Sequence, residues 1–149
     1  MSMVGVLILT HGRMADELLA AGRKITGELE AFESLALEWT DGFDEAQAKV
    51  GEALERLDQG DGVLVLTDIF GGTPSNVAMA YVDTGKVEVV SGVNLPMVVR
   101  LGCLRNHNSM PLDEMGAWIR EKGRDSICCG SNVPRPSRKK APLPDCEER

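Results

Sequence analysis

Hydrophobic and polar positions follow two periodicities along this chain, and the pattern predicts strands separated by helices. Two short runs are almost wholly apolar, Val4–His11 and Val63–Asp68, as is typical of parallel strands buried on both faces. Phe32–Trp39 alternates apolar and polar residues instead, which indicates a strand with one buried face. Lys86–Ser91 is a fourth expected strand, and Arg124–Cys129 is the candidate for a short final one.

Segments with apolar residues at helical spacing lie between these runs. The expected helices are Met14–Thr26, the stripe from Phe43 to Leu57, Asn76–Val82, Pro96–Leu104 and a last helix opened by Pro111. This alternation predicts an α/β fold with a mostly parallel sheet, right-handed crossovers and helices on both faces, in three layers. The two apolar runs belong in the middle and the alternating run at an edge, so the expected strand order is 2-1-3-4 plus a short C-terminal edge strand.

The chain divides by composition into one domain, residues 1–130, and a tail, residues 131–149. Its 149 residues suffice for one domain with a proper core. The tail holds four of the seven prolines and a basic cluster at residues 138–140, and it contains almost nothing to bury. We expect it to be disordered.

The charge and the cysteines exclude several classes of function. A net charge of −7 argues against nucleic acid or an anionic membrane as the main partner and favours a basic protein. No apolar stretch is long enough to span a bilayer and no secretory signal is present at the start, so we expect a cytoplasmic protein. The four cysteines include no C-x-x-C pair and are expected to be reduced thiols. We expect neither a metal nor a cofactor.

Two residues able to do chemistry stand at the ends of the two apolar runs, His11 and Asp68. The carboxyl ends of adjacent parallel strands form the ligand crevice of an open α/β sheet, so we expect these side chains to meet. A carboxylate bonded to Nδ1 would fix the tautomer and leave Nε2 as a nucleophile, and the helix that follows His11 would stabilise a phosphate there. A structural histidine and a loop or capping aspartate are the alternatives.

The loop after Asp68 offers groups that suit a phosphate. Gly71 and Gly72 let the backbone approach closely, and Thr67, Thr73 and Ser75 supply hydroxyls. No lysine follows the glycines and no G-x-G-x-x-G follows the first strand, so nucleotide binding has little support.

Three segments together resemble the enzyme IIA domain of the mannose-type phosphotransferase system (PTS). They are VGVLILTHGRMADELL, VLVLTDIFGGTPSNVAM and SGVNLPMVVRL, in that order and spacing. The resemblance covers about Met3–Gly130. It implies the strand order given above and a homodimer in which an added edge strand, here Arg124–Cys129, can be exchanged.

The resemblance also implies roles for individual residues. His11 would accept a phosphoryl group from the phosphocarrier HPr and pass it to a IIB protein, with Asp68 bonded to the histidine. The phosphate site would be lined by Gly12, Thr67, Gly71, Gly72 and Thr73. The expected residues for partner docking are Phe70, Arg13, Asn94 and Pro96. Phe70 stands where sugar-transporting members often carry tryptophan.

Four functions compete at this stage. The leading one is a phosphocarrier that serves a separate IIB protein in sugar uptake. The second is a regulatory module that binds a partner protein according to the phosphorylation state of His11, without sugar transport. A dihydroxyacetone-kinase phosphodonor is a third, weaker option. A phosphatase is the least supported, because no second histidine or evident general acid is placed to complete hydrolysis.

Overall fold

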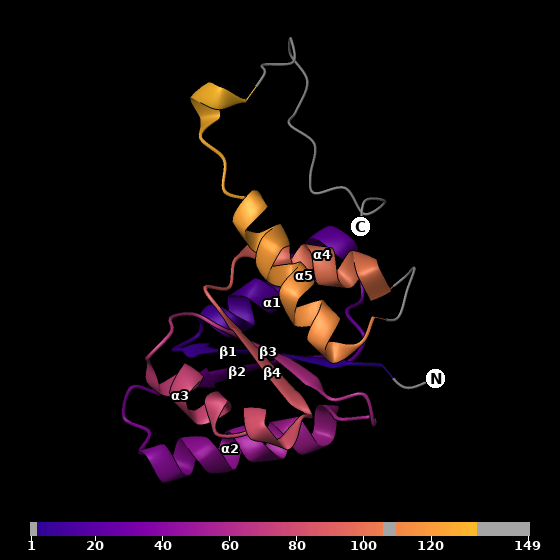
Figure 1. Cartoon of the computed structure of the whole chain (residues 1–149). Coiled ribbons are helices and arrows are strands. Elements are labelled where there is room, and N and C mark those ends of the chain that lie inside the picture. The colour runs from indigo at the N-terminus through magenta and orange to yellow at the C-terminus, as the bar shows by residue number, and fades with distance from the viewer. Residues whose placement is uncertain (1–2, 106–109, 134–149) are drawn as a thin grey trace.

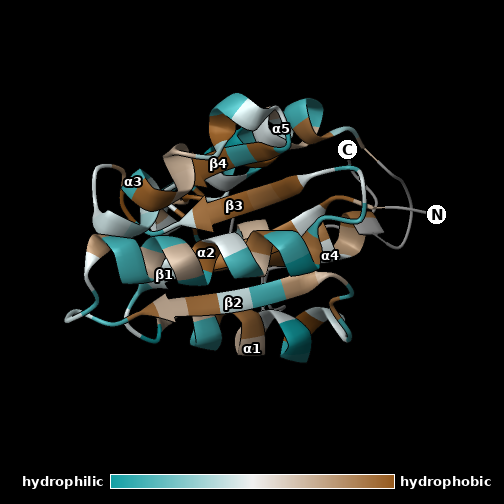
Figure 2. Cartoon of the chain, turned by 90° about the horizontal axis from the view of Figure 1, so that it is seen from below, coloured by the Kyte–Doolittle hydropathy of each residue, from teal (hydrophilic) through white to brown (hydrophobic). Residues whose placement is uncertain are grey.

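A parallel sheet forms the centre of the computed structural model, which describes residues 3–105 and 110–133. Its four strands are β1 (Gly5–His11), β2 (Phe32–Leu37), β3 (Val63–Thr67) and β4 (Val87–Ser91). They are ordered β2-β1-β3-β4, which confirms the predicted order. The strand order matches the hydropathy in Figure 2, where the central strand β3 is hydrophobic along its length and the edge strand β2 mixes hydrophobic and polar residues.

Helices cover both faces of the sheet and make three layers (Figure 1). One face carries α1 (Met14–Thr26), α4 (Leu95–Arg105) and α5 (Leu112–Asp125), and the other carries α2 (Phe43–Leu57) and α3 (Thr73–Met79). Short 3₁₀ turns lie at Val82–Thr84 and Gly130–Asn132. The helix expected at residues 76–82 is thus displaced. It begins at Thr73, directly after Gly72, with Pro74 in its first turn, where proline's missing N–H costs nothing.

Alternate side chains of β1 anchor the strand in the two halves of the core. Val6 and Ile8 pack beneath α1, α4 and α5, while Leu7 and Leu9 face α2 and α3, and all four are fully buried. Burial of each such side chain stabilises the fold by about 1.5–3 kcal/mol. The strand that ends in His11 is therefore held rigidly from both sides.

Parallel register brings the ends of β1, β2 and β3 to one edge of the sheet. His11 pairs with Leu37 of β2, and Leu9 pairs with Thr67, the last residue of β3. Asp68 follows Thr67 directly, so it leaves the sheet beside His11. The edge formed by these strand ends is where the candidate site lies.

Within a single chain, the predicted C-terminal strand at Arg124–Cys129 is not formed. Helix α5 continues to Asp125, and the chain after it runs away from the sheet without a ladder partner (Figure 1). Ile127 is 79% exposed as a result. A strand needs a neighbour to satisfy its backbone groups, and within the described residues none lies beside this segment.

Two further expectations concern the rest of the chain. The expectation of reduced thiols is wrong for Cys103, which is disulfide-bonded, while Cys128 and Cys129 are free. Cys146 and residues 134–149 of the expected disordered tail lie outside the described residues, whereas residues 131–133 of that tail are described. Within the described ranges, no helix is both long and apolar enough to cross a membrane.

Candidate active site

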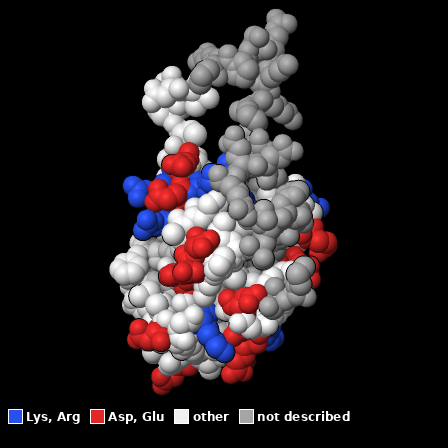
Figure 3. Space-filling model, turned by 45° about the vertical axis from the view of Figure 1, so that its right-hand side comes forward, with Lys and Arg blue, Asp and Glu red and all other residues white. Residues whose placement is uncertain are grey.

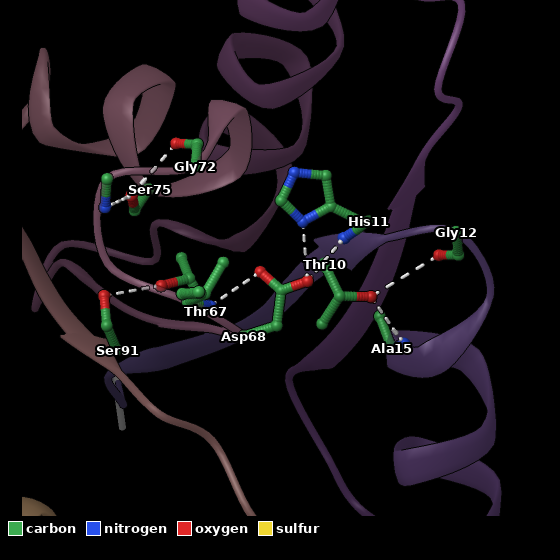
Figure 4. Close-up of polar contacts among 11 residues, drawn as sticks. Thr10, His11, Gly12, Ala15, Thr67, Asp68, Gly72, Ser75 and Ser91 are labelled. Carbon is green, nitrogen blue, oxygen red and sulfur yellow. Dashed lines mark hydrogen bonds and ion pairs between the residues drawn. The ribbon is translucent and has the colours of Figure 1, made fainter.

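His11 and Asp68 meet at the carboxyl edge of the sheet, as their positions after β1 and β3 led us to expect. Nδ1 of His11 lies 2.8 Å from Oδ2 of Asp68, and the backbone N–H of His11 donates to the same oxygen at 2.9 Å (Figure 4). The side chains are 21% and 11% exposed, so solvent and a partner can still reach the histidine.

The electrostatics of Asp68 decide which nitrogen of His11 is available. Burial alone would raise the pKa of the Asp68 carboxyl, but the hydrogen bonds from His11 and from the backbone N–H of Ile69 outweigh it and hold that pKa below its ordinary value. An ionised carboxylate only accepts hydrogen bonds, so Nδ1 carries the proton. In the neutral ring, Nε2 then has the lone pair.

Gly72 lies against the Cε1–Nε2 edge of the His11 ring (Figure 4). A Cβ added to Gly72 would come within 2.7 Å of Cε1 and 3.3 Å of Nε2 of His11. Real Cβ atoms essentially never approach that closely, so only glycine allows this backbone to touch the ring. Gly72, one of the residues expected around a phosphate, therefore lies beside Nε2.

Of the other residues expected to bind phosphate, Gly12, Gly71 and Thr67 are held by hydrogen bonds within the protein. Gly12 adopts a φ of +56° and donates its N–H to the Leu37 carbonyl, which turns the chain from β1 into α1. The Gly71 N–H donates to the Ser75 hydroxyl at 2.8 Å. Thr67 is fully buried, and its hydroxyl bonds to Ser91 at 2.7 Å. The exposed residue Thr73 begins α3 next to Gly72.

Two residues of the site escaped the sequence analysis. Trp39, in the turn after β2, stacks on the His11 ring with the ring centroids 4.8 Å apart and the planes 16° apart. Thr10 accepts the Ala15 N–H at 2.8 Å and so caps the first turn of α1. The available signals were a large aromatic residue just past an edge strand and a hydroxyl just before a helix, both of which are common elsewhere.

The residues expected to dock partners fall into two groups. Phe70 is 74% exposed beside the site, and Arg13 is an exposed residue at the start of α1, 3.9 Å from Glu17. Asn94 is already occupied: its amide donates to the Gly123 carbonyl at 3.1 Å, and its oxygen accepts the Met97 N–H.

Asn94 therefore joins the start of α4 to the end of α5. Pro96, two residues after Asn94, is only partly exposed.

Exposed apolar side chains flank His11 on two loops and form what we call the apolar collar, which consists of Trp39, Ile69 and Phe70. Their exposed fractions are 79%, 60% and 74%. On the face seen in Figure 3, the described Lys and Arg side chains occur in small groups between acidic ones. Among the described residues, no group of three or more His, Cys, Asp or Glu could hold a metal ion.

Comparison with known families shows to which family the chain belongs. A family described as the PTS system fructose IIA component, EIIA-man, matches residues 5–115, a range that contains His11, Asp68 and Gly72. The chain belongs to the EIIA-man family. The resemblance drawn from the three sequence segments is thereby confirmed.

Two relatives of this EIIA-man chain are named for different sugars. It is 32% identical over 142 residues to the PTS system mannose-specific EIIAB component of Escherichia coli K12, a match that covers 95% of this chain and 43% of the relative. The chain thus spans less than half the length of that relative. It is also 32% identical over 106 residues to the PTS system fructose-specific EIIA component of Bacillus subtilis 168, covering 70% and 73%.

Solved structures of the family share the fold. The mannose/sorbose specific IIA subunit from Enterococcus faecalis superposes with a TM-score of 0.79 at 31% identity, over 91% of this chain and all of the subunit. The parallel sheet with order 2-1-3-4 and helices on both faces is therefore the EIIA fold.

Proposed function

We propose that this chain is a phosphocarrier of the phosphoenolpyruvate-dependent sugar phosphotransferase system. Nε2 of His11 accepts a phosphoryl group from phosphorylated HPr and passes it to a IIB protein. The observation that carries this proposal is the 2.8 Å contact between Nδ1 of His11 and Asp68. It holds the proton on Nδ1, so that Nε2 of the neutral ring keeps the lone pair that attacks phosphorus.

The transfer step needs alignment more than covalent help. As the Nε2 lone pair attacks phosphorus, the bond between phosphorus and the donor's nitrogen breaks, and that nitrogen recovers its electron pair. The Nδ1 proton stays in the hydrogen bond to Asp68, whose negative charge stabilises the ring as the phosphoryl group arrives. The return step to the acceptor reverses these changes, so the chain is unchanged after one cycle.

The surroundings of Nε2 suit a transient phosphate. The backbone at Gly72 leaves room for the phosphoryl oxygens where any side chain would intrude. Helix α1 begins three residues after His11, and its positive N-terminal end favours an anion at that position. Thr73 adds an exposed hydroxyl beside Gly72.

Partner proteins would dock on the apolar collar, which includes Phe70, with Arg13 nearby at the start of α1. Exposed aromatic and arginine side chains are typical anchors of protein interfaces. This arrangement supports protein donors and acceptors rather than a free small substrate, because three exposed apolar side chains near one histidine offer a surface that a protein can cover.

We also propose that the protein forms a homodimer. Strand β4 pairs only with β3 among the described residues, so its outer edge is open. The segment after α5 extends away from the body, with Ile127 79% and Val133 42% exposed. The segment after α5 of one copy can pair with the open edge of β4 in the other copy, and the reverse pairing completes a symmetric dimer.

The test is transfer of labelled phosphate from phosphoenolpyruvate through enzyme I and HPr. Wild type should acquire an acid-labile label that His11→Ala abolishes and Asp68→Ala reduces. His107→Ala is the matched control for the other histidine and should label normally. Label that reaches the protein but moves to no IIB protein of the same organism would favour the regulatory module instead, and no label on folded wild type would reject both.

A further inference from the structure

The face of the His11 ring is covered by Trp39, which lies in the turn just after β2. We propose that Trp39 is a positioning residue that fixes the plane of the His11 imidazole and thereby aims Nε2 at the incoming phosphorus. This inference rests on the proposed phosphocarrier function and adds a residue to it. Its basis is the stacked geometry, 4.8 Å between centroids and 16° between planes.

The hydrogen bond to Asp68 does not by itself determine the ring plane. It restrains Nδ1, but such bonds tolerate about 30° of departure from linearity before they weaken strongly. Rotation about the Cβ–Cγ bond within that range swings Nε2, because Nε2 lies off the rotation axis. A flat indole against the ring face limits this rotation, and the Gly72 backbone limits it at the ring edge.

The position of Trp39 follows from the sheet. Leu37 pairs with His11 in the parallel register, and the Leu37 carbonyl accepts the Gly12 N–H at 2.9 Å. Trp39 comes two residues later, just beyond the edge of the sheet. An added Cβ on Gly12 would lie 3.7 Å from Nε1 of Trp39, so the indole spans both Gly12 and His11.

The turn that carries Trp39 is restrained by contacts of Asp41, two residues further along the chain. The Asp41 carboxylate accepts the Glu38 N–H at 3.0 Å and pairs with Lys49 of α2 at 2.9 Å. The Asp41 side chain is only 8% exposed, and these bonds hold the pKa of its carboxyl below the ordinary value. The indole is thus presented from a restrained loop.

Burial does not explain why a tryptophan stands here. Trp39 remains 79% exposed and belongs to neither cluster of core side chains. Its stacking contact with the protein is the one made to the histidine ring. A tryptophan kept largely in water while it covers a nucleophilic histidine points to a role at that histidine.

An in-line phosphoryl transfer is faster when the plane of the His11 ring is restrained. The lone pair of Nε2 lies in the ring plane, so the direction of attack is set by the orientation of the plane. Loss of one aromatic contact should lower the rate at saturating donor by about threefold to tenfold. The affinity for a small donor should not change, because the indole makes no contact that such a donor requires.

Phosphoramidate, a small chemical donor, separates positioning from protein docking. When Nε2 of His11 attacks the phosphorus of its zwitterionic form, ⁺H₃N–PO₃²⁻, the P–N bond breaks and neutral ammonia leaves with that bond's electron pair. We would measure the rate of His11 phosphorylation against phosphoramidate concentration for wild type, Trp39→Leu and Trp39→Phe. Trp118→Phe is the matched control, since Trp118 is a half-buried residue of α5 remote from the site.

We expect Trp39→Leu to lower the maximum rate about threefold to tenfold, Trp39→Phe to restore most of it, and Trp118→Phe to match wild type. In NMR spectra, ring-current shifts of the His11 ring protons should be present in wild type and lost in Trp39→Leu. Equal or faster labelling of Trp39→Leu would overturn the inference, as would the absence of ring-current shifts or of any His11 label from phosphoramidate.

The same variants with phosphorylated HPr distinguish this inference from the proposed function. If phosphoramidate labels wild type faster than Trp39→Leu but HPr labels neither, the positioning role stands and the proposed donor is wrong. If HPr labels wild type and the phosphoramidate rates are equal, the phosphocarrier function stands and Trp39 does not position the ring.

Discussion

Oδ2 of Asp68 accepts two hydrogen bonds from His11, one from the backbone N–H at 2.9 Å and one from Nδ1 at 2.8 Å. One oxygen at the end of β3 therefore holds both the main chain and the ring at the end of β1. The other carboxylate oxygen accepts the Ile69 N–H at 2.9 Å. All three groups that contact the carboxylate are donors, so a residue here must be able to accept on both sides.

Asp68→Asn should slow phosphorylation of His11 by about tenfold to a hundredfold, the range typical of an outer partner that orients an imidazole. An amide has one acceptor end only, so its NH₂ must face either His11 or the Ile69 N–H. The measurement is the labelling rate from phosphorylated HPr. Asp44→Asn in the first turn of α2 is the control and should label at the wild-type rate. Wild-type kinetics in Asp68→Asn would contradict this role.

Gly72→Ala should displace the His11 ring and reduce labelling by at least about tenfold, since its Cβ would lie 2.7 Å from Cε1. Overpacking of this kind also costs about 1–3 kcal/mol of stability. Labelling rate and urea unfolding together measure the two effects. Gly42→Ala is the matched control, because a Cβ there meets nothing within 4 Å and the φ of −70° suits alanine. Equal labelling by both variants would show that the ring edge at Gly72 is not restrictive.

The free energy of unfolding should decrease as the solution is acidified below about pH 4, near the ordinary value for aspartate. The carboxyl pKa values of Asp68, Asp58 and Asp41 are held below that value in the folded protein. Such groups stabilise the fold above the unfolded pKa and lose that contribution as pH falls through the folded pKa. Urea unfolding at stepwise lower pH measures the trend.

Asp68→Asn removes one of these groups, so its stability should depend less steeply on pH in the same acidic range. A curve for Asp68→Asn that is parallel to wild type throughout would mean that the carboxyl at residue 68 is not stabilised in its ionised form.

Ile127→Asp should weaken the proposed homodimer, since a charge replaces a 79% exposed apolar side chain on the extended segment after α5. Light scattering after gel filtration should show a lower mean mass at equal concentration, with an unchanged thermal midpoint for the monomer. Lys24→Asp in the last turn of α1 changes charge at another exposed site and should leave the mass unchanged. A wild type that remains monomeric at high concentration would reject the dimer itself.

Local pattern was sufficient for the four strands of the sheet and their order. Apolar runs of strand length, helical stripes and the alternating pattern of β2 predicted the parallel sheet and its strand order, because burial on two faces or on one leaves a periodicity in the chain. The same order brought His11 beside Asp68, since the carboxyl ends of adjacent parallel strands share an edge. The displaced start of α3 and the absent strand after α5 show the limit: helix ends and edge pairing depend on neighbours that no local pattern records.

By itself, then, the sequence determined the sheet, its order and the pair of residues at its edge. Tertiary structure alone decided that Trp39 covers the ring, that Gly72 touches it and that the Thr67 hydroxyl is buried against Ser91. The contacts of Trp39 and Gly72 are made by the turns that follow β2 and β3, whereas Thr67 and Ser91 are paired residues at the ends of β3 and β4. The geometry of the first two contacts depends on how those turns fold back over the edge of the sheet, which side-chain periodicity does not encode.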